Sequence, residues 1–156
     1  MNKLLKMFLA VLICEGVGLL GSVFTITQIP AWYASLIKPS FSPPDFIFGP
    51  VWTVLYALMG ISLVLALEKS PEKKKFMIIF LFALQLILNF LWSVIFFTGH
   101  QPVLALLDIV LLCACIFGLI AIFRKYSFAS AVLLVPYLAW VSFATLLNLF
   151  IILLNT

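Results

Sequence analysis

The chain has 156 residues, of which 66% are hydrophobic and only 9% are charged, and its formal net charge is +4. A soluble domain carries roughly 25% charged residues and about half apolar ones. A soluble fold of this length is therefore excluded, because it could not bury so much apolar surface. A lipid bilayer solvates such a surface instead. We expect an all-α integral membrane protein in which residues 1–156 form a single transmembrane domain.

Five stretches with at most one charge each reach the roughly 20 residues that a spanning helix needs. In chain order, they predict transmembrane helices at about 4–27, 46–67, 76–98, 102–123 and 127–153. The first stretch follows Lys3 and Lys6, as in a signal peptide. Its apolar run is longer than a typical h-region and no clear A-x-A site follows it, so we expect it to be retained.

The connections between the predicted helices differ in charge, and this difference predicts the orientation. With five spans, the amino terminus and the 68–75 and 124–125 loops share one side and carry eight of the nine basic residues, while the other side carries only Lys38. The positive-inside rule places the amino terminus in the cytoplasm and the carboxyl terminus outside the cell membrane. Lys73–Lys75 are interpreted as an anchor near anionic lipid headgroups. No nucleic-acid partner is expected.

Residues 28–45 form the only connection long enough to hold structure of its own. This segment contains four of the eight prolines and several aromatic residues. Because a passive external loop would be polar, we expect this one to pack on the helix ends as a lid. A floppy connector is the alternative.

Small residues and two acids interrupt the apolar spans. The small residues Gly16, Gly18, Gly21, Ser22, Ala114 and Gly118 are expected to allow close helix approach. Glu15 and Asp108 are intramembrane acids. Each is interpreted either as a functional group or as a protonated acid bonded to a neighbouring helix.

Polar and aromatic residues recur at helical spacing on three of the predicted helices. They are Trp52 and Tyr56 on the second, Gln85, Asn89, Trp92 and Phe96 on the third, and Tyr137, Trp140, Ala144 and Asn148 on the fifth. Each set lies on one helix face. Amides in hydrocarbon are unfavourable unless they face protein or a cavity, so these faces should point into the bundle. Two interpretations stay open: interhelical hydrogen bonds with interfacial tryptophan belts, or a ligand pocket.

The usual catalytic and metal-binding patterns are absent from the sequence. Cys14, Cys113 and Cys115 lie in predicted spans and suit neither a disulfide framework nor a zinc site. His100, the single histidine, lies in a predicted turn and is expected to be solvated. A histidine-ligated haem is therefore not expected, and we predict no metal and no resident cofactor.

Several motifs over nearly the whole chain together resemble one family. They are Trp32-Tyr33, Lys38-Pro39-Ser40-Phe41-Ser42-Pro43-Pro44, Phe48-Gly49-Pro50-Val51-Trp52-Thr53 with Leu55-Tyr56, Gln85-Leu86, Leu88-Asn89, Trp92-Ser93 with Phe96-Phe97, and Pro136-Tyr137-Leu138-Ala139-Trp140 with Phe143-Ala144-Thr145 and Leu147-Asn148. The chain resembles the TspO/MBR family of tryptophan-rich sensory proteins, whose animal members are called translocator protein or peripheral-type benzodiazepine receptor.

The resemblance implies a five-helix bundle, often a homodimer, with a pocket under the long first loop for porphyrins and, in many members, benzodiazepine-receptor-type drugs. Carried over by position, the ligand-binding residues would be Trp52, Asn89, Trp92 and Trp140, with Tyr33, Pro43, Tyr56 and Ala144 around them. Protoporphyrin is then the expected ligand or substrate. Trp52 and Trp140 are the catalytic candidates for light-dependent porphyrin oxidation. A tetrapyrrole transporter, or a stress sensor or scaffold without catalysis, is the alternative.

Overall fold

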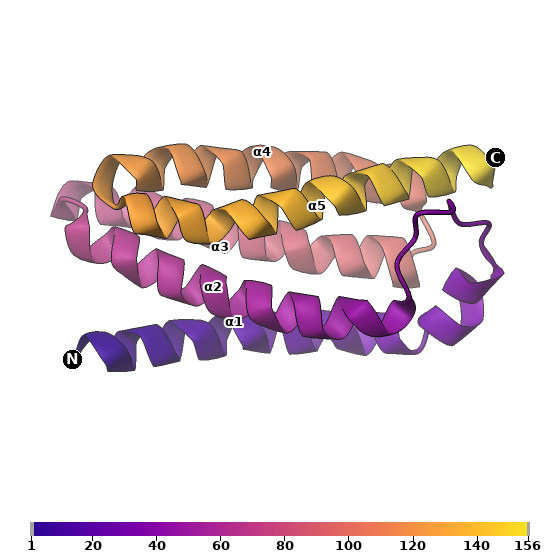
Figure 1. Cartoon of the computed structure of the whole chain (residues 1–156), viewed down its shortest axis with the longest axis horizontal. Coiled ribbons are helices and arrows are strands. Elements are labelled where there is room, and N and C mark those ends of the chain that lie inside the picture. The colour runs from indigo at the N-terminus through magenta and orange to yellow at the C-terminus, as the bar shows by residue number, and fades with distance from the viewer. Residues whose placement is uncertain (1, 156) are drawn as a thin grey trace.

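The computed structural model describes residues 2–155 and arranges five long helices side by side in one bundle (Figure 1). The long helices are α1 (Lys3–Ile26), α2 (Phe48–Lys69), α3 (Glu72–Ser93), α4 (Pro102–Tyr126) and α5 (Phe128–Leu154). The described residues contain no strand, and all five helices are long and apolar enough to cross a membrane. The prediction of an all-α, five-helix membrane bundle is confirmed.

Three short helices complete the fold: a π-helix at Ile29–Tyr33, a 3-10 helix at Asp45–Ile47 that leads into α2, and a π-helix at Val94–Thr98 that continues α3. α3 begins at Glu72 rather than at residue 76. A charged residue marks contact with water but does not end a helix. The negative charge of Glu72 in the first turn interacts favourably with the helix dipole, and lysines are good helix formers. For the same reason α4 continues through Arg124 and Lys125, which lie in its last turn.

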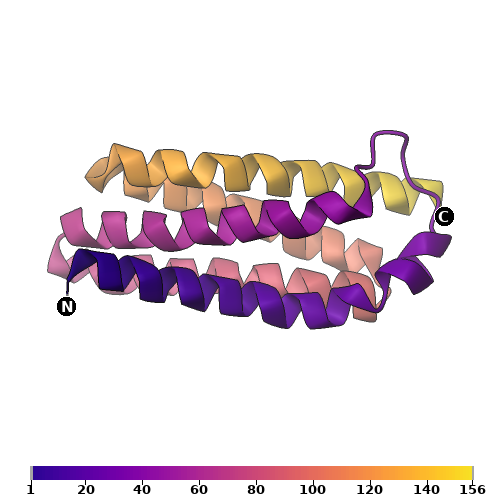
Figure 2. The ribbon, with the colours of Figure 1, turned by 60° about the horizontal axis from the view of Figure 1, so that its bottom comes forward.

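The two ends of the bundle differ. The amino terminus and the α2–α3 and α4–α5 connections lie at one end, which we call the amino-terminal end (Figures 1 and 2). The carboxyl terminus lies at the opposite end with residues 29–44, which we call the lid (Figures 1 and 2). α4 packs mainly on α5 and α3, whereas α1 packs mainly on α2 and α3. α1 buries only Cys14 and Gly21 and is the least enclosed wall of the bundle.

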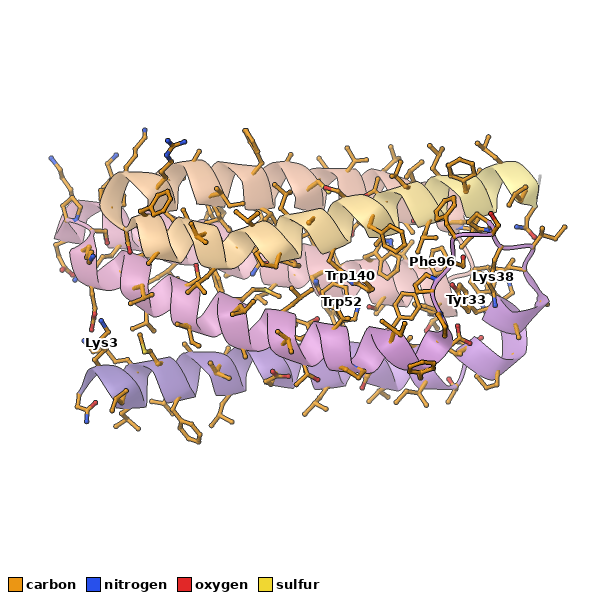
Figure 3. All side chains as sticks on the ribbon, viewed as in Figure 1. Lys3, Tyr33, Lys38, Trp52, Phe96 and Trp140 are labelled. Atoms are coloured by element: carbon orange, nitrogen blue, oxygen red, sulfur yellow. The ribbon has the colours of Figure 1, made fainter. Side chains whose placement is uncertain are left out.

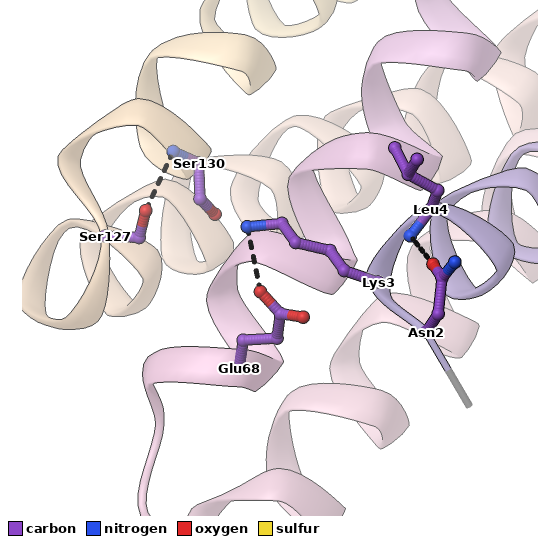
Figure 4. Close-up of polar contacts among 6 residues, drawn as sticks. All are labelled: Asn2, Lys3, Leu4, Glu68, Ser127 and Ser130. Carbon is purple, nitrogen blue, oxygen red and sulfur yellow. Dashed lines mark hydrogen bonds and ion pairs between the residues drawn. The ribbon is translucent and has the colours of Figure 1, made fainter.

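Side chains cap the starts of α1 and α5 at the amino-terminal end (Figure 4). Asn2 Oδ1 accepts a hydrogen bond from the Leu4 N–H at 2.7 Å, and Ser127 Oγ accepts one from the Ser130 N–H at 3.4 Å. These side chains satisfy backbone donors that a helix start leaves free. Lys3 Nζ lies 2.9 Å from Glu68 Oε2 and joins α1 to α2 at the same end.

Two pairs of helices approach closely through small residues. Ser62 on α2 and Ser130 on α5 exchange hydrogen bonds, since each hydroxyl donates to the other residue's carbonyl oxygen, at 2.8 and 2.9 Å. At Gly60, a Cβ atom would lie 2.6 Å from the Val11 amide nitrogen and 2.7 Å from its Cα. The α1–α2 crossing therefore depends on the absence of a side chain at Gly60.

The predicted close approach is confirmed at only some of the glycines. A Cβ at Gly18 would collide with the Tyr56 ring, and one at Gly21 would contact Ser93 Oγ at 3.5 Å. The expectation is wrong at Gly16 and Gly118, because a Cβ there meets nothing within 4 Å. Helix spacing alone does not distinguish a glycine that faces a neighbouring backbone from one that faces lipid.

We expect Gly60→Ala to lower the free energy of unfolding by about 1–3 kcal/mol, the usual cost of overpacking. The added methyl group meets the α1 backbone, which cannot rotate away as a side chain can. Gly118→Ala is the matched control, because open space surrounds that position; it should be neutral or slightly stabilising. Thermal unfolding in detergent measures both, and an equal effect of the two substitutions would contradict this account of the crossing.

Candidate functional site

A cavity of about 340 Å³ lies among α1, α2, α3, α5 and the lid. Its lining runs from Tyr33 in the lid down to Glu15 on α1, Tyr56 on α2 and Asn89 on α3. Trp52 and Trp140 lie deeper in the bundle than Tyr33 and Phe96 (Figure 3). None of the described residues of α4 belongs to the lining. The volume is within the range of ligand pockets in proteins.

The structure brings most of the predicted site residues into this one cavity. Its lining includes Tyr33, Trp52, Tyr56, Asn89, Trp92, Trp140 and Ala144. Pro43 lies elsewhere, in an apolar surface groove that it shares with residues of α2 and α5. The extended backbone at Pro44 carries the chain from the lid to the start of α2, and this path leaves Pro43 on the outer side of the α2–α5 seam. Trp140 lines both the cavity and the groove.

Four buried side chains form a hydrogen-bond chain at the inner end of the cavity. The Tyr56 hydroxyl donates to Asn89 Oδ1 at 2.6 Å, and Asn89 Nδ2 donates to the Tyr137 oxygen at 3.0 Å. The Tyr137 hydroxyl in turn donates to Gln85 Oε1 at 2.9 Å. The amides therefore face the bundle interior as predicted. The interpretation as interhelical hydrogen bonding holds for Gln85 and Asn89, and Asn89 also belongs to the cavity lining.

The indole N–H groups of Trp92 and Trp140 differ in their partners. Trp92 Nε1 donates to Asn148 Oδ1 at 3.1 Å, and Asn148 Nδ2 donates to the Pro102 carbonyl oxygen at 2.8 Å. Trp140 Nε1 is buried without a hydrogen-bond partner among residues 2–155. A buried, unpaired donor is unfavourable, and Trp140 therefore differs from Trp92 in lacking a partner for its N–H.

Aromatic rings supply much of the remaining wall. Trp52 stacks on Tyr56 with ring centroids 5.5 Å apart, and Trp92 stacks on Phe96 at 5.1 Å. Phe48 meets Trp140 edge to face at 5.8 Å. Faces and edges arranged in this way favour a flat apolar ligand, because aromatic pairs prefer offset stacking and edge-to-face contacts.

The lid is structured and is fastened at several places, which confirms the predicted structured loop. The Trp32 ring stacks on the His100 ring at 4.4 Å, and His100 Nε2 lies 3.0 Å from Gln28 Oε1. Farther along, Asn155 Oδ1 accepts from the Ile37 N–H, and Asn155 Nδ2 donates to the Ile37 oxygen, both at 2.9 Å. His100 is exposed as expected, but its stacking contact was not predicted.

Charged groups in the lining are few and are all acidic: Glu15 at the inner end and Asp45 near the lid. Burial, and secondarily the nearby Asp45, raises the pKa of Tyr33 to about 12, so this hydroxyl stays protonated at neutral pH. Asp108 lies on α4 outside the cavity, and its Oδ2 is buried without a hydrogen-bond partner. Within residues 2–155 no three His, Cys, Asp or Glu side chains come together as a metal site.

These features define a polytopic helical membrane protein with one aromatic cavity beneath an ordered lid. The model of the TspO/MBR family matches residues 10–154, and the chain belongs to this family. It is 43% identical to the tryptophan-rich protein TspO of Chlorobaculum tepidum, over 99% of both chains, and 41% identical to that of Archaeoglobus fulgidus, over 98% of this chain and 99% of the relative. It is 38% identical to the translocator protein of Homo sapiens, over 82% of this chain and 77% of the relative.

The hydrogen-bond chain predicts different costs for two Tyr→Phe substitutions. Tyr137→Phe leaves Asn89 Nδ2 and Gln85 Oε1 without their partner, and each buried unpaired group costs about 1–3 kcal/mol. Tyr56→Phe frees only Asn89 Oδ1, which borders the cavity. We therefore expect Tyr137→Phe to lower the free energy of unfolding at least twice as much. Unfolding in mixed detergent measures both losses. Equal losses would contradict the predicted difference, and no loss in either variant would show that the hydrogen-bond chain does not stabilise the bundle.

Proposed function

We propose that this membrane protein binds a tetrapyrrole such as protoporphyrin in the cavity beneath the lid and promotes its light-dependent oxidative degradation, thereby regulating tetrapyrrole levels. One observation carries the proposal: Trp52 on α2 and Trp140 on α5 line the same cavity. A porphyrin is a large, flat, mostly apolar ring, and indole faces are suited to stack on it. The amide of Asn89 would orient its polar atoms.

A metal-free porphyrin suits this cavity better than haem does. Histidine is the commonest proximal haem ligand, and the only histidine, His100, stacks on Trp32 outside the cavity lining. Porphyrin without a central metal has a long-lived excited state that can take an electron from a nearby indole or generate reactive oxygen beside it. Dissolved dioxygen would be the oxidant. The excited ring would take an electron from the indole of Trp52 or Trp140 and pass it to dioxygen, which gives superoxide. The indole radical would then recover an electron from the porphyrin, and the porphyrin radical cation would combine with superoxide, while the lid would keep water away from the reaction.

The proposal extends to ligand range, assembly and orientation. An aromatic cavity of this kind also suits flat drugs of the benzodiazepine-receptor type. A homodimer in the cell membrane, with a cytoplasmic amino terminus and an external carboxyl terminus, belongs to the same proposal. The second candidate is a tetrapyrrole transporter or a stress sensor without catalysis. Flux of porphyrin into liposomes would distinguish transport from degradation.

Trp52→Phe and Trp140→Phe should separate binding from chemistry. Phenylalanine keeps an aromatic face, so porphyrin affinity should fall by only about 1 kcal/mol. It is a much poorer electron donor, so most light-dependent porphyrin loss should disappear. Absorption spectra of the purified protein with protoporphyrin, in the dark and in light, give both quantities. Trp32→Phe is the matched control, because Trp32 lies in the lid outside the cavity lining.

The opposite pattern would refute the redox role. It would be weaker binding in both cavity variants with normal decay of each porphyrin that still binds. Absence of any saturable protoporphyrin binding to the wild-type protein would refute the proposed ligand itself.

The proposed orientation predicts where a reporter becomes active. A periplasmic-type reporter fused after the last residue should be active, because the eight basic residues of the amino-terminal end hold that end in the cytoplasm. The same reporter fused in the α2–α3 connection should be inactive. A cytoplasmic signal from the carboxyl-terminal fusion would reverse the assigned orientation.

A further inference from the structure

Charge is distributed very unevenly between the two ends of the bundle. Eight of the nine basic residues lie at the amino-terminal end, on the first turns of α1 and around the α2–α3 and α4–α5 connections. Lys38 is the only lysine or arginine at the lid end, where His100 stacks on Trp32. The lining of the cavity contains Glu15 and Asp45 but no lysine, arginine or histidine. An anionic group on a ligand therefore meets two acids in the cavity lining, and Lys38 is the lysine that lies against a lining residue, Tyr33.

The residues directly before and after Lys38 in the sequence hold its backbone in place beside the cavity. Its Nζ lies 4.3 Å from the centroid of the Tyr33 ring, which lines the cavity. The preceding residue, Ile37, has both of its backbone polar groups hydrogen-bonded to Asn155. The following residue, Pro39, is buried and restricts Lys38 to an extended backbone. Figure 3 shows Lys38 next to Tyr33 at the lid end, with Trp52 and Trp140 farther in.

The Lys38 ammonium has no carboxylate partner within residues 2–155, where the ion pairs are Lys3–Glu68 and Lys75–Glu72. Instead it faces an aromatic ring, an arrangement in which a cation keeps its capacity to bind an anion. A lysine stem also allows the head group to shift while the chain stays fixed. The structure thus presents a positioned cation without a carboxylate partner, and this cation lies against Tyr33, a residue of the cavity lining.

We propose that Lys38 anchors the carboxylates of an anionic amphipathic ligand at the lid end, so that the ligand enters the cavity with its apolar edge toward Trp52 and Trp140. This inference rests on the proposed tetrapyrrole binding and names the residue that fixes the orientation of the ligand. A carboxylate turned inward would be buried near Glu15 without a base, which is strongly unfavourable. A carboxylate at the lid meets Lys38 and remains partly hydrated, whereas the negative charge of Asp45, which also lines the cavity, opposes it.

Protoporphyrin and its dimethyl ester test this assignment, because they share one ring and differ in charge. Titration of purified protein in the dark gives both dissociation constants. Lys38→Gln should weaken binding of the free acid about tenfold, as expected for a lost charge-assisted hydrogen bond, and should change binding of the ester less than twofold. Lys38→Arg should keep most of the affinity for the acid. Lys125→Gln, at the opposite end, is the matched control and should change neither.

Asp45→Asn gives an independent measurement with the opposite sign. It removes the opposing charge and should strengthen binding of the free acid severalfold without affecting the ester. Equal weakening of acid and ester by Lys38→Gln would overturn the proposal, since it would mean that Lys38 only shapes the lid. Unchanged acid binding in Lys38→Gln would also overturn it, while the proposed function would stand. If neither compound binds the wild-type protein, the proposed function fails and the anchoring role fails with it.

Discussion

The hydrogen-bond chain from Tyr56 through Asn89 and Tyr137 to Gln85 ties α2, α3 and α5 together at one level of the bundle. Water is scarce at this depth of a membrane protein, so a group that loses its partner finds no substitute. Each bond in the chain donates in the same direction, from the cavity toward the core. A shift of any one of the three helices along its axis would break at least one of these bonds. The inner end of the cavity therefore has a defined position.

The rest of the cavity depends on this fixed level. Trp52 lies one turn before Tyr56 on α2, and Trp92 lies one turn after Asn89 on α3. Because Tyr56 and Asn89 belong to the hydrogen-bond chain, their positions also set the positions of both indoles. Trp140 follows Tyr137 by three residues on α5. Three helices thus carry a tryptophan within one turn of a buried polar anchor. Such spacing places the indoles around one space rather than at separate membrane interfaces, as interfacial belts would require.

Periodicity was sufficient to predict these three faces, because a helix places residues four apart on one side whatever its neighbours are. It could not predict contacts between segments that lie far apart in the sequence. Three contacts are of that kind: the hydrogen bonds between Asn155 and Ile37, the stacking of His100 on Trp32, and the close approach of Gly60 to Val11. The family resemblance placed Pro43 with the cavity residues, but the path of the chain after the lid takes it to the outer seam.

α1 and the lid form the other side of the cavity and are held in a different way. α1 contributes only Cys14 and Gly21 to the buried residues, and its contact with α2 depends on a glycine rather than on interlocking side chains. The lid is attached at several places along its length: Trp32 stacks on His100, Ile37 is hydrogen-bonded to Asn155, and Phe41 packs on Phe150 of α5. Elements with few buried contacts open at lower free energy than the elements of a packed core. The cavity therefore combines an aromatic wall on α2, α3 and α5, which is tied to the hydrogen-bond chain, with a wall on α1 and the lid, which contributes no residue to that chain.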